Sequence, residues 1–341
     1  MKQEYIQTKN EIKRKRPRID FGLLSLIIIL LTLGTFMIFS ASYPYASNHY
    51  SDGFYYIKRH LIFLFIGVLL MLLISRVNIL VIRKFTPFFY IACIVLLILV
   101  LFTGFSEGIA KRWLGIPGTP LSFQPSELMK LGLILMLSSY IAKTEGAKKT
   151  FLKEIIFPGL ILFGACGLVL LEKHLSGTII LALIGISILF ISGISLKKAI
   201  ISYGGPGIVA GTIFLLTNSY AMKRILSFFN PNADILSDKW QTTQGLYAIG
   251  SGGVFGLGYF ASRQKYSYVS EPQNDFIFTI WCEETGYIGA VALLALFLLL
   301  IWKGYSIAFA QKNTYESMVA FGITTQIGIQ AFLNMLVATE M

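Results

Sequence analysis

The chain has 341 residues, of which 55% are hydrophobic and 13% charged, and its formal net charge is +12. This composition is too apolar for an ordinary soluble protein, so the sequence predicts a membrane protein. Basic cytoplasmic loops that meet anionic lipids suffice to explain the positive charge, and no nucleic-acid partner is expected. Cys93, Cys166 and Cys282 stand singly and lack the spacing of a metal site or a disulfide framework.

Nine apolar runs approach or exceed the roughly 20 residues that a membrane-spanning helix needs. They cover residues 21–41, 59–75, 85–103, 125–142, 155–171, 177–194, 199–217, 276–302 and 317–341. The first run follows a basic head, residues 1–20, and is too long for a cleaved signal peptide. With the N-terminus inside the cell, the inside segments hold more lysine and arginine than the outside segments, as the positive-inside rule requires. The sequence therefore predicts an all-α, multi-pass protein of the cytoplasmic membrane, with a transmembrane domain over residues 21–341.

The segment from about 218 to 275, between the seventh and eighth runs, is far longer than an ordinary loop. By the predicted topology it lies outside the cell, and exposed loops commonly carry function. Its stretch GSGGVFGLG follows no strand and does not match a nucleotide-binding loop, so a flexible or re-entrant turn is the better interpretation. Backbone at membrane depth has to be covered by protein or to line a wet cavity.

The stretch EPQNDFIFTIWCEETG places three carboxylates at the start of the eighth run, those of Asp275, Glu283 and Glu284. On a helix, Asp275 and Glu283 share one face, and that face cannot point at lipid. The ninth run has a similar polar stripe, and the two stripes together suggest one internal cavity: Gln326, Gln330 and Asn334. Asp275 is either a general base or half of an ion pair. For each glutamate, pairing with a cation of a neighbouring helix is an equal alternative to a functional role.

An earlier outer segment, KRWLGIPGTPLSFQPSELMK, contains further candidates. Arg112 and Trp113 are suited to hold a lipid head group or a phosphate, although a simple interface anchor has the same composition. Glu127 and Lys130, three residues apart where a span begins, fit a structural pair better than a functional site. His174, in LLEKHLSGT, is expected to be solvated or to cap the next helix. The sequence has no P-loop and no D-x-D run, so its substrate is expected from the membrane or from outside.

Several stretches resemble the SEDS family, the shape, elongation, division and sporulation proteins of the FtsW and RodA type. They run in the family's order from about residue 20 to the last residue: GTFMIFSAS, KRWLGI, FQPSELMKL, SGT, RILSFFNP, QTTQGLYAIGSGGVFGLG, SRQKY, EPQNDFIF and EETG. At HLSGT the family usually has an aspartate, which puts a polar role of that turn in question. The stretches SRQKY and EPQNDFIF favour the FtsW branch.

The resemblance implies a bundle of ten transmembrane helices that polymerises peptidoglycan strands from lipid II at the outer face of the cytoplasmic membrane. A class B penicillin-binding protein, which cross-links the strands, is the implied partner. The chain stops at NMLVATEM, where the family continues into a tenth helix. Nine of the ten helices are therefore expected here, and the sequence is expected to be incomplete at its C-terminus.

The same resemblance makes Asp275 the catalytic residue and assigns other positions to the substrate cavity: Arg112, Trp113, Gln124, Glu127, Lys130, Arg263 and Lys265. Glu283 joins them because it shares a helical face with Asp275. Asp275 would take the proton of the acceptor hydroxyl in one inverting displacement. The cationic side chains, or a divalent cation such as Mg²⁺ or Mn²⁺, would stabilise the diphosphate leaving group. Two alternatives stay open, a transporter that flips lipid II and a non-catalytic scaffold for the partner enzyme.

Overall fold

The computed structural model describes residues 19–106, 111–115, 122–146, 150–194, 198, 200–217, 222, 240–266, 268–269 and 272–339. Residues 1–18 of the basic head and most of the first half of the long loop lie outside these ranges. The described helices are α2 (Phe21–Tyr50), α3 (Tyr55–Ile74), α4 (Ile79–Thr103), α5 (Pro125–Thr144), α6 (Phe157–Leu171), α7 (Leu175–Ile191), α9 (Gly205–Thr217), α11 (Trp240–Gly252), α12 (Ile277–Ala310) and α13 (Thr314–Ala338). Two π-helical turns, η1 (Leu152–Ile156) and η2 (Ile200–Gly204), lead into α6 and α9.

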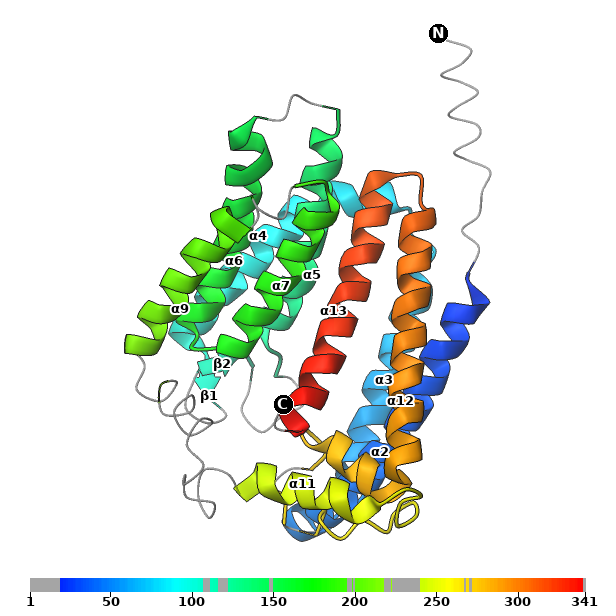
Figure 1. Cartoon of the computed structure of the whole chain (residues 1–341). Helices are drawn as coiled ribbons and strands as arrows, with labels where there is room; N and C mark the ends of the chain where they lie inside the picture. Colours follow the sequence, from blue (N-terminus) through cyan, green and yellow to red (C-terminus); the bar gives the residue numbers. More distant parts are fainter. Residues whose placement is uncertain are drawn as a thin grey trace.

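The helices form one bundle in which each predicted span overlaps a helix (Figure 1). In the described ranges, six helices are long and apolar enough to cross a membrane: α2, α3, α4, the continuous helix of η1 and α6, α12 and α13. This confirms the all-α, multi-pass class. Several helices are longer than their predicted spans, and the largest extensions carry α2 to Tyr50, α12 to Ala310 and the start of α4 back to Ile79. An unpredicted two-stranded antiparallel pair joins β1 (Phe105–Ser106) to β2 (Lys111–Trp113).

Short polar side chains cap the N-termini of three helices, because the first backbone N–H groups of a helix have no acceptor within it. Asp20 Oδ1 accepts a hydrogen bond from Leu23 N at 3.0 Å at the start of α2. Asn78 and Asn313 cap α4 and α13 in the same way, through bonds of 2.9 Å to the backbone two residues on. These caps mark where each of the three helices begins.

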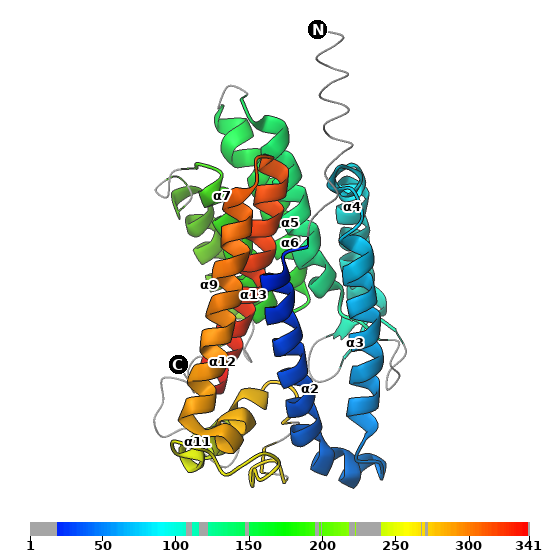
Figure 2. The same ribbon diagram turned by 90° about the vertical axis from the view of Figure 1, so that its right-hand side faces the viewer.

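The bundle has two packed halves with α13 between them. In Figure 1, α4, α5, α6, α7 and α9 lie on one side of α13, and α2, α3 and α12 lie on the other. α13 packs against α12 and also against α5 and α7. The larger apolar core lies among α4, α5, α6 and α7, and a smaller one joins α2 to α12 through Met37, Ala41 and Ile280. At the edge of the bundle, α3 packs mainly against α2 (Figure 2).

Tyrosine hydroxyls bind backbone carbonyls around the helix that contains Pro158. Proline cannot donate a backbone hydrogen bond, and the π-helical turn η1 directly precedes it. Tyr203 Oη donates to the Ile155 carbonyl at 2.9 Å, and Tyr90 Oη donates to the Ile161 carbonyl at 2.7 Å. Such partners matter within a membrane, where no bulk water replaces them.

One end of the bundle holds the C-terminal end of α2, the N-terminal end of α12, α11 and the β1–β2 pair, and we call it the site end. The opposite end holds Phe21 and Ala310. The site end is at the bottom of Figure 1, where α11 lies across the ends of α12 and α2.

Candidate active site

α12 is interrupted close to the site end at Gly286, whose φ of 70° lies in the left-handed region. The turn of residues 253–258 takes the place of the missing helical hydrogen bonds. Four backbone bonds join the two segments: Leu257 N to Glu283 O at 2.9 Å, Gly258 N to Glu284 O at 3.0 Å, Tyr287 N to Gly253 O at 2.9 Å, and Ile288 N to Val254 O at 3.2 Å. The stretch GSGGVFGLG therefore ends α11 and continues, over residues 253–258, as a turn that covers polar backbone inside the bundle, one of the two interpretations that its sequence favoured.

Glycine is required at two positions of this junction. Gly256 has a φ of 80° and lies directly against the backbone of Glu284 and Gly286, so a Cβ atom there would overlap main-chain atoms. A Cβ on Gly286 would meet the backbone of Val254, Phe255 and Gly256. Close approach of two backbones and positive φ are the two conditions that favour glycine.

Five buried polar side chains lie beside the break, and we call them the Lys265 cluster: Ser40, Ser262, Lys265, Glu283 and Glu284. Lys265 Nζ donates to Glu284 Oε1 at 2.9 Å, to Ser40 Oγ at 3.0 Å and to the Phe260 carbonyl at 2.8 Å. The ammonium group thus has an acceptor for each of its three protons. The cluster ties α2, the loop of residues 259–266 and α12 together.

Glu283 is the second carboxylate of the cluster, and its exposed fraction is 0%. Its oxygens accept hydrogen bonds from Ser262 Oγ at 2.5 Å, Arg263 N at 2.9 Å, Gln264 N at 3.4 Å and Ser251 Oγ at 3.4 Å. Three of these four donors belong to consecutive residues of one loop. Glu283 therefore holds the loop of residues 262–264 onto α12.

The two cations of the SRQKY stretch lie in different environments. Lys265 is 1% exposed and is bound within the cluster, whereas Arg263 is exposed at the site end. The backbone of Arg263 is fixed by Glu283, so its guanidinium projects from an ordered point. Of these two cations, Arg263 is the one that a ligand can reach.

Asp275 lies in the turn just before α12 and is exposed. Within the described ranges its carboxylate has no hydrogen-bond or ion-pair partner. It borders a pocket of about 220 Å³ between α2, α12 and α13. The pocket is mainly apolar, and its walls include Leu33, Met37, Trp281, Phe297 and Met335. Asn274 and Asn334 are the polar neighbours of Asp275 there, so one residue of the predicted α13 stripe shares a cavity with it.

The remaining predicted residues meet at a second group of side chains, which we call the His174 cluster: Arg112, Gln124, Ser126, Glu127, Lys130, Glu172 and His174. Gln124 Nε2 lies 3.1 Å from His174 Nδ1, and Arg112 Nη2 donates to the Lys173 carbonyl at 2.8 Å. Glu127 and Lys130 form the expected ion pair, with 2.6 Å between Oε2 and Nζ. Trp113, next to Arg112, is the last residue of β2 and pairs with Phe105.

Burial dominates the electrostatics of this second cluster. The pKa of His174 is lowered to about 4, first by burial and then by the charge of Arg112. Burial raises the pKa of Glu172 to about 7, while the charge of Arg112 opposes the rise. Glu172 is 3% exposed, and within the described part of the chain neither of its oxygens has a hydrogen-bond partner.

Sequence reasoning did not select Glu172 and expected His174 to be solvated or to cap a helix. His174 does occupy the N-cap position of α7, but its side chain makes no cap bond and points instead to Gln124 and Ser126. The signal that could have indicated a role for His174 is that it stands in the HLSGT turn, where the resembled family usually has an aspartate.

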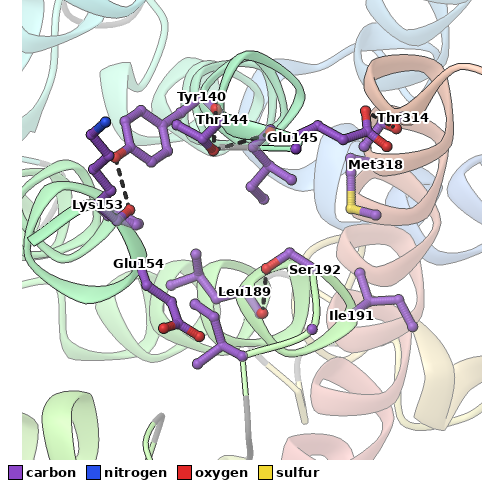
Figure 3. A pocket seen from close by; sticks show the side chains of 15 residues that line it. Tyr140, Thr144, Glu145, Lys153, Glu154, Leu189, Ile191, Ser192, Thr314 and Met318 are labelled. Atoms are coloured by element: carbon purple, nitrogen blue, oxygen red, sulfur yellow. Dashed lines mark hydrogen bonds between the residues drawn. The ribbon is translucent and has the colours of Figure 1, made fainter. Parts of the chain in front are cut away.

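A larger cavity of about 320 Å³ lies at the opposite end, between α5, η1, α7 and α13 (Figure 3). Its walls carry Glu145, whose Oε2 accepts from Thr314 Oγ1 at 2.6 Å, and Glu154, which pairs with Lys198 at 3.4 Å. Both carboxylates have partners, and none of the predicted site residues lines this cavity. Chemistry therefore favours the smaller pocket beside Asp275 as the candidate site.

The donor set for a metal ion is small. Within the described ranges, no group of three or more His, Cys, Asp or Glu side chains is placed to hold one. Asp275 has amide neighbours but no second carboxylate on the walls of its pocket. Because these residues do not build a metal site by themselves, we derive no step through a metal.

Fold and site together define a multi-pass α-helical membrane protein with charged side chains gathered at one end of its bundle. The sequence profile of the FtsW/RodA/SpoVE family, described as cell cycle proteins, matches residues 21–341. The chain belongs to this family, whose members are the SEDS proteins.

Individual relatives match over nearly the whole chain. Stage V sporulation protein E of Bacillus subtilis (strain 168) is 35% identical over 328 residues, which are 95% of this chain and 88% of that protein. The probable peptidoglycan glycosyltransferase FtsW of Geobacter sp. (strain M18) is 34% identical and covers 94% of this chain and 87% of its own length.

Two solved structures share the fold at 24% sequence identity. The rod shape determining protein RodA of Thermus thermophilus has a TM-score of 0.66 and covers 94% of this chain and 85% of its own. A chain from a structure described as the structural coordination of polymerization and crosslinking by a peptidoglycan synthase complex has a TM-score of 0.73, with 94% and 87% covered.

Proposed function

We propose that this protein is a glycosyltransferase that polymerises lipid II into glycan strands, with the site end on the outer face of the cytoplasmic membrane. The relatives named as probable peptidoglycan glycosyltransferases support the reaction class. The observation that carries the proposal is Asp275, an exposed carboxylate without a partner in the described ranges, at the mouth of an apolar pocket. A carboxylate held in an ion pair would be poorly available as a base, and among the described residues this one has no such partner.

The chemistry requires an acceptor hydroxyl to attack the anomeric carbon of a lipid-linked donor as the lipid diphosphate leaves. Asp275 takes the proton of the hydroxyl, a contribution of about 10²–10⁴-fold to the rate. To Arg263, which is exposed at the same end, we assign the stabilisation of the negative charge that develops on the diphosphate. A single displacement of this kind inverts the anomeric centre and forms no covalent intermediate with the protein.

The proposed partner is a class B penicillin-binding protein that cross-links the new strands. A similar fold occurs in a synthase complex described as coordinating polymerization and crosslinking, which supports this pairing. A scaffold without catalytic activity would bind the same partner and make no polymer.

The test is polymerisation of purified lipid II by the full chain together with its partner. Asp275→Asn is expected to lower the rate by about 10²-fold or more, because the amide cannot accept the proton. The matched control is Asp52→Asn, which removes another carboxylate at the site end, one that pairs with Lys58 at 2.8 Å. The control is expected to keep the parent rate, and unchanged polymerisation by Asp275→Asn would refute the assignment.

A further inference from the structure

Glu283 was expected to touch substrate, but its surroundings give it a different task. The carboxylate is fully buried, and four hydrogen-bond donors face it. Among the described residues it forms no ion pair, since Lys265 binds Glu284 instead. A buried carboxylate held by several donors from one loop is well suited to fix the conformation of that loop.

The loop that Glu283 holds carries a reachable cation. The bond from Arg263 N to Glu283 Oε1 is 2.9 Å long, and the bonds from Ser262 Oγ and Gln264 N hold the residues on both sides. The backbone of Arg263 is therefore bound to α12, and α12 begins two residues after Asp275. The first segment of α12 thus binds the loop of Arg263 and follows closely after the proposed base.

We infer that Glu283 is a positioning residue, which fixes the backbone of residues 262–264 so that the Arg263 guanidinium is held ready for the diphosphate of a lipid-linked substrate. The inference rests on the proposed function for the identity of the ligand. It assigns Glu283 no contact with substrate, and its whole effect on the reaction passes through Arg263.

Glu283→Gln tests this because the amide has nearly the same shape but presents its own NH₂ group to donors. Glu283→Gln, Arg263→Ala and the double variant are each compared with the parent, with the full chain in lipid nanodiscs. The two readouts are the Kd for undecaprenyl diphosphate and the rate of lipid II polymerisation. Each single variant is expected to weaken binding by about 10-fold, the loss of one charged hydrogen bond. The double variant is expected to bind no more weakly than Arg263→Ala, since residues that act as a unit are not additive.

Ser251→Ala is the matched control, because it removes the bond to Glu283 that does not come from the loop of Arg263. It is expected to keep the parent Kd. If Glu283→Gln fails to fold, Ser262→Ala replaces it, because it removes the shortest bond to Glu283 without adding an amide. Ser262→Ala is expected to reproduce part of the loss of binding expected for Glu283→Gln. Thermal unfolding of all variants separates stability from positioning, since a loss of stability is not cancelled by removing the Arg263 side chain.

Additive losses in the double variant, or a parent chain that does not bind undecaprenyl diphosphate, would overturn the inference. A coupled binding cycle in a chain that makes no polymer would support the positioning role and contradict the proposed polymerase. Polymerisation by the parent chain, together with additive losses in the binding cycle, would support the proposed polymerase and contradict the positioning role.

Discussion

At the scale of single residues, the buried pair of Lys265 and Glu284 is the most consequential electrostatic feature. Both side chains are 0% exposed, and Glu284 Oε2 has no hydrogen-bond partner within the described ranges. Removing one member leaves an uncompensated buried charge, whereas removing both leaves an apolar contact. The pair therefore matters for stability mainly because neither charge can be lost alone.

Lys265→Met is accordingly expected to cost about 3–5 kcal/mol of stability, and the double variant Lys265→Met with Glu284→Met much less. The measurement is thermal unfolding with a thiol-reactive dye, since Cys93, Cys166 and Cys282 are all buried and free. Losses that simply add in the double variant would show that the pair is not coupled.

Glu172 makes a prediction about pH. Burial raises its pKa from 4.5 to about 7, so the folded chain holds this proton more tightly than the unfolded chain. The folded state therefore loses stability as the pH rises from about 4.5 to 7, by at most about 3 kcal/mol. Glu172→Gln should be more stable than the parent at pH 8 and nearly equal to it at pH 4.5.

Unfolding curves of both chains across this pH range test the prediction. Burial lowers the pKa of His174 to about 4, so this residue makes the folded state less stable as the pH falls below about 6.5. Because both chains contain His174, this effect does not contribute to the difference between them. A stability difference between the chains that does not change with pH would contradict the raised pKa of Glu172.

The sequence already distinguished the carboxylates of the EPQNDFIFTIWCEETG stretch in part. Helical spacing left Glu284 for pairing or packing, and Glu284 does form an ion pair. The same spacing put Asp275 and Glu283 on one helical face, which is wrong, because α12 begins only at Ile277 and Asp275 lies in the turn before it. The partners of Glu283 could not be predicted, because they lie in a loop about twenty residues earlier whose path depends on the break in α12.

At the scale of elements, the interrupted helix α12 and its glycine turn form one unit. Hydropathy predicts a continuous span here, since apolar residues continue on both sides of Gly286. The break becomes visible only when the turn of residues 253–258 supplies the replacement hydrogen bonds. Periodicity finds helices well, but it cannot show where two distant backbones pair.

Gly256→Ala should disrupt this unit, because its Cβ would overlap the Glu284 backbone at a positive φ. We expect a loss of at least about 2 kcal/mol in stability. The control is Gly250→Ala in α11, where no atom lies within 4 Å of the new Cβ and alanine favours the helix. Equal melting temperatures for Gly256→Ala and the parent would show that the turn tolerates a side chain.

At the scale of the whole molecule, the apolar runs predicted the class and the approximate position of every described bundle helix. They did not predict that Arg112, Gln124, Lys130 and His174 gather in one cluster while Asp275 borders a separate pocket. That division depends on how the two halves pack on either side of α13. The proposed orientation puts both groups on the outer face.

The most direct test of the account is one set of proteoliposomes, carrying the full chain and its partner, in which glycan polymer and lipid II translocation are recorded together. The proposed polymerase activity predicts polymer from the parent chain, a loss of about 10²-fold or more in Asp275→Asn, and no translocation that depends on the protein. Translocation that persists in Asp275→Asn, with no polymer from either chain, would contradict it and identify a lipid II transporter.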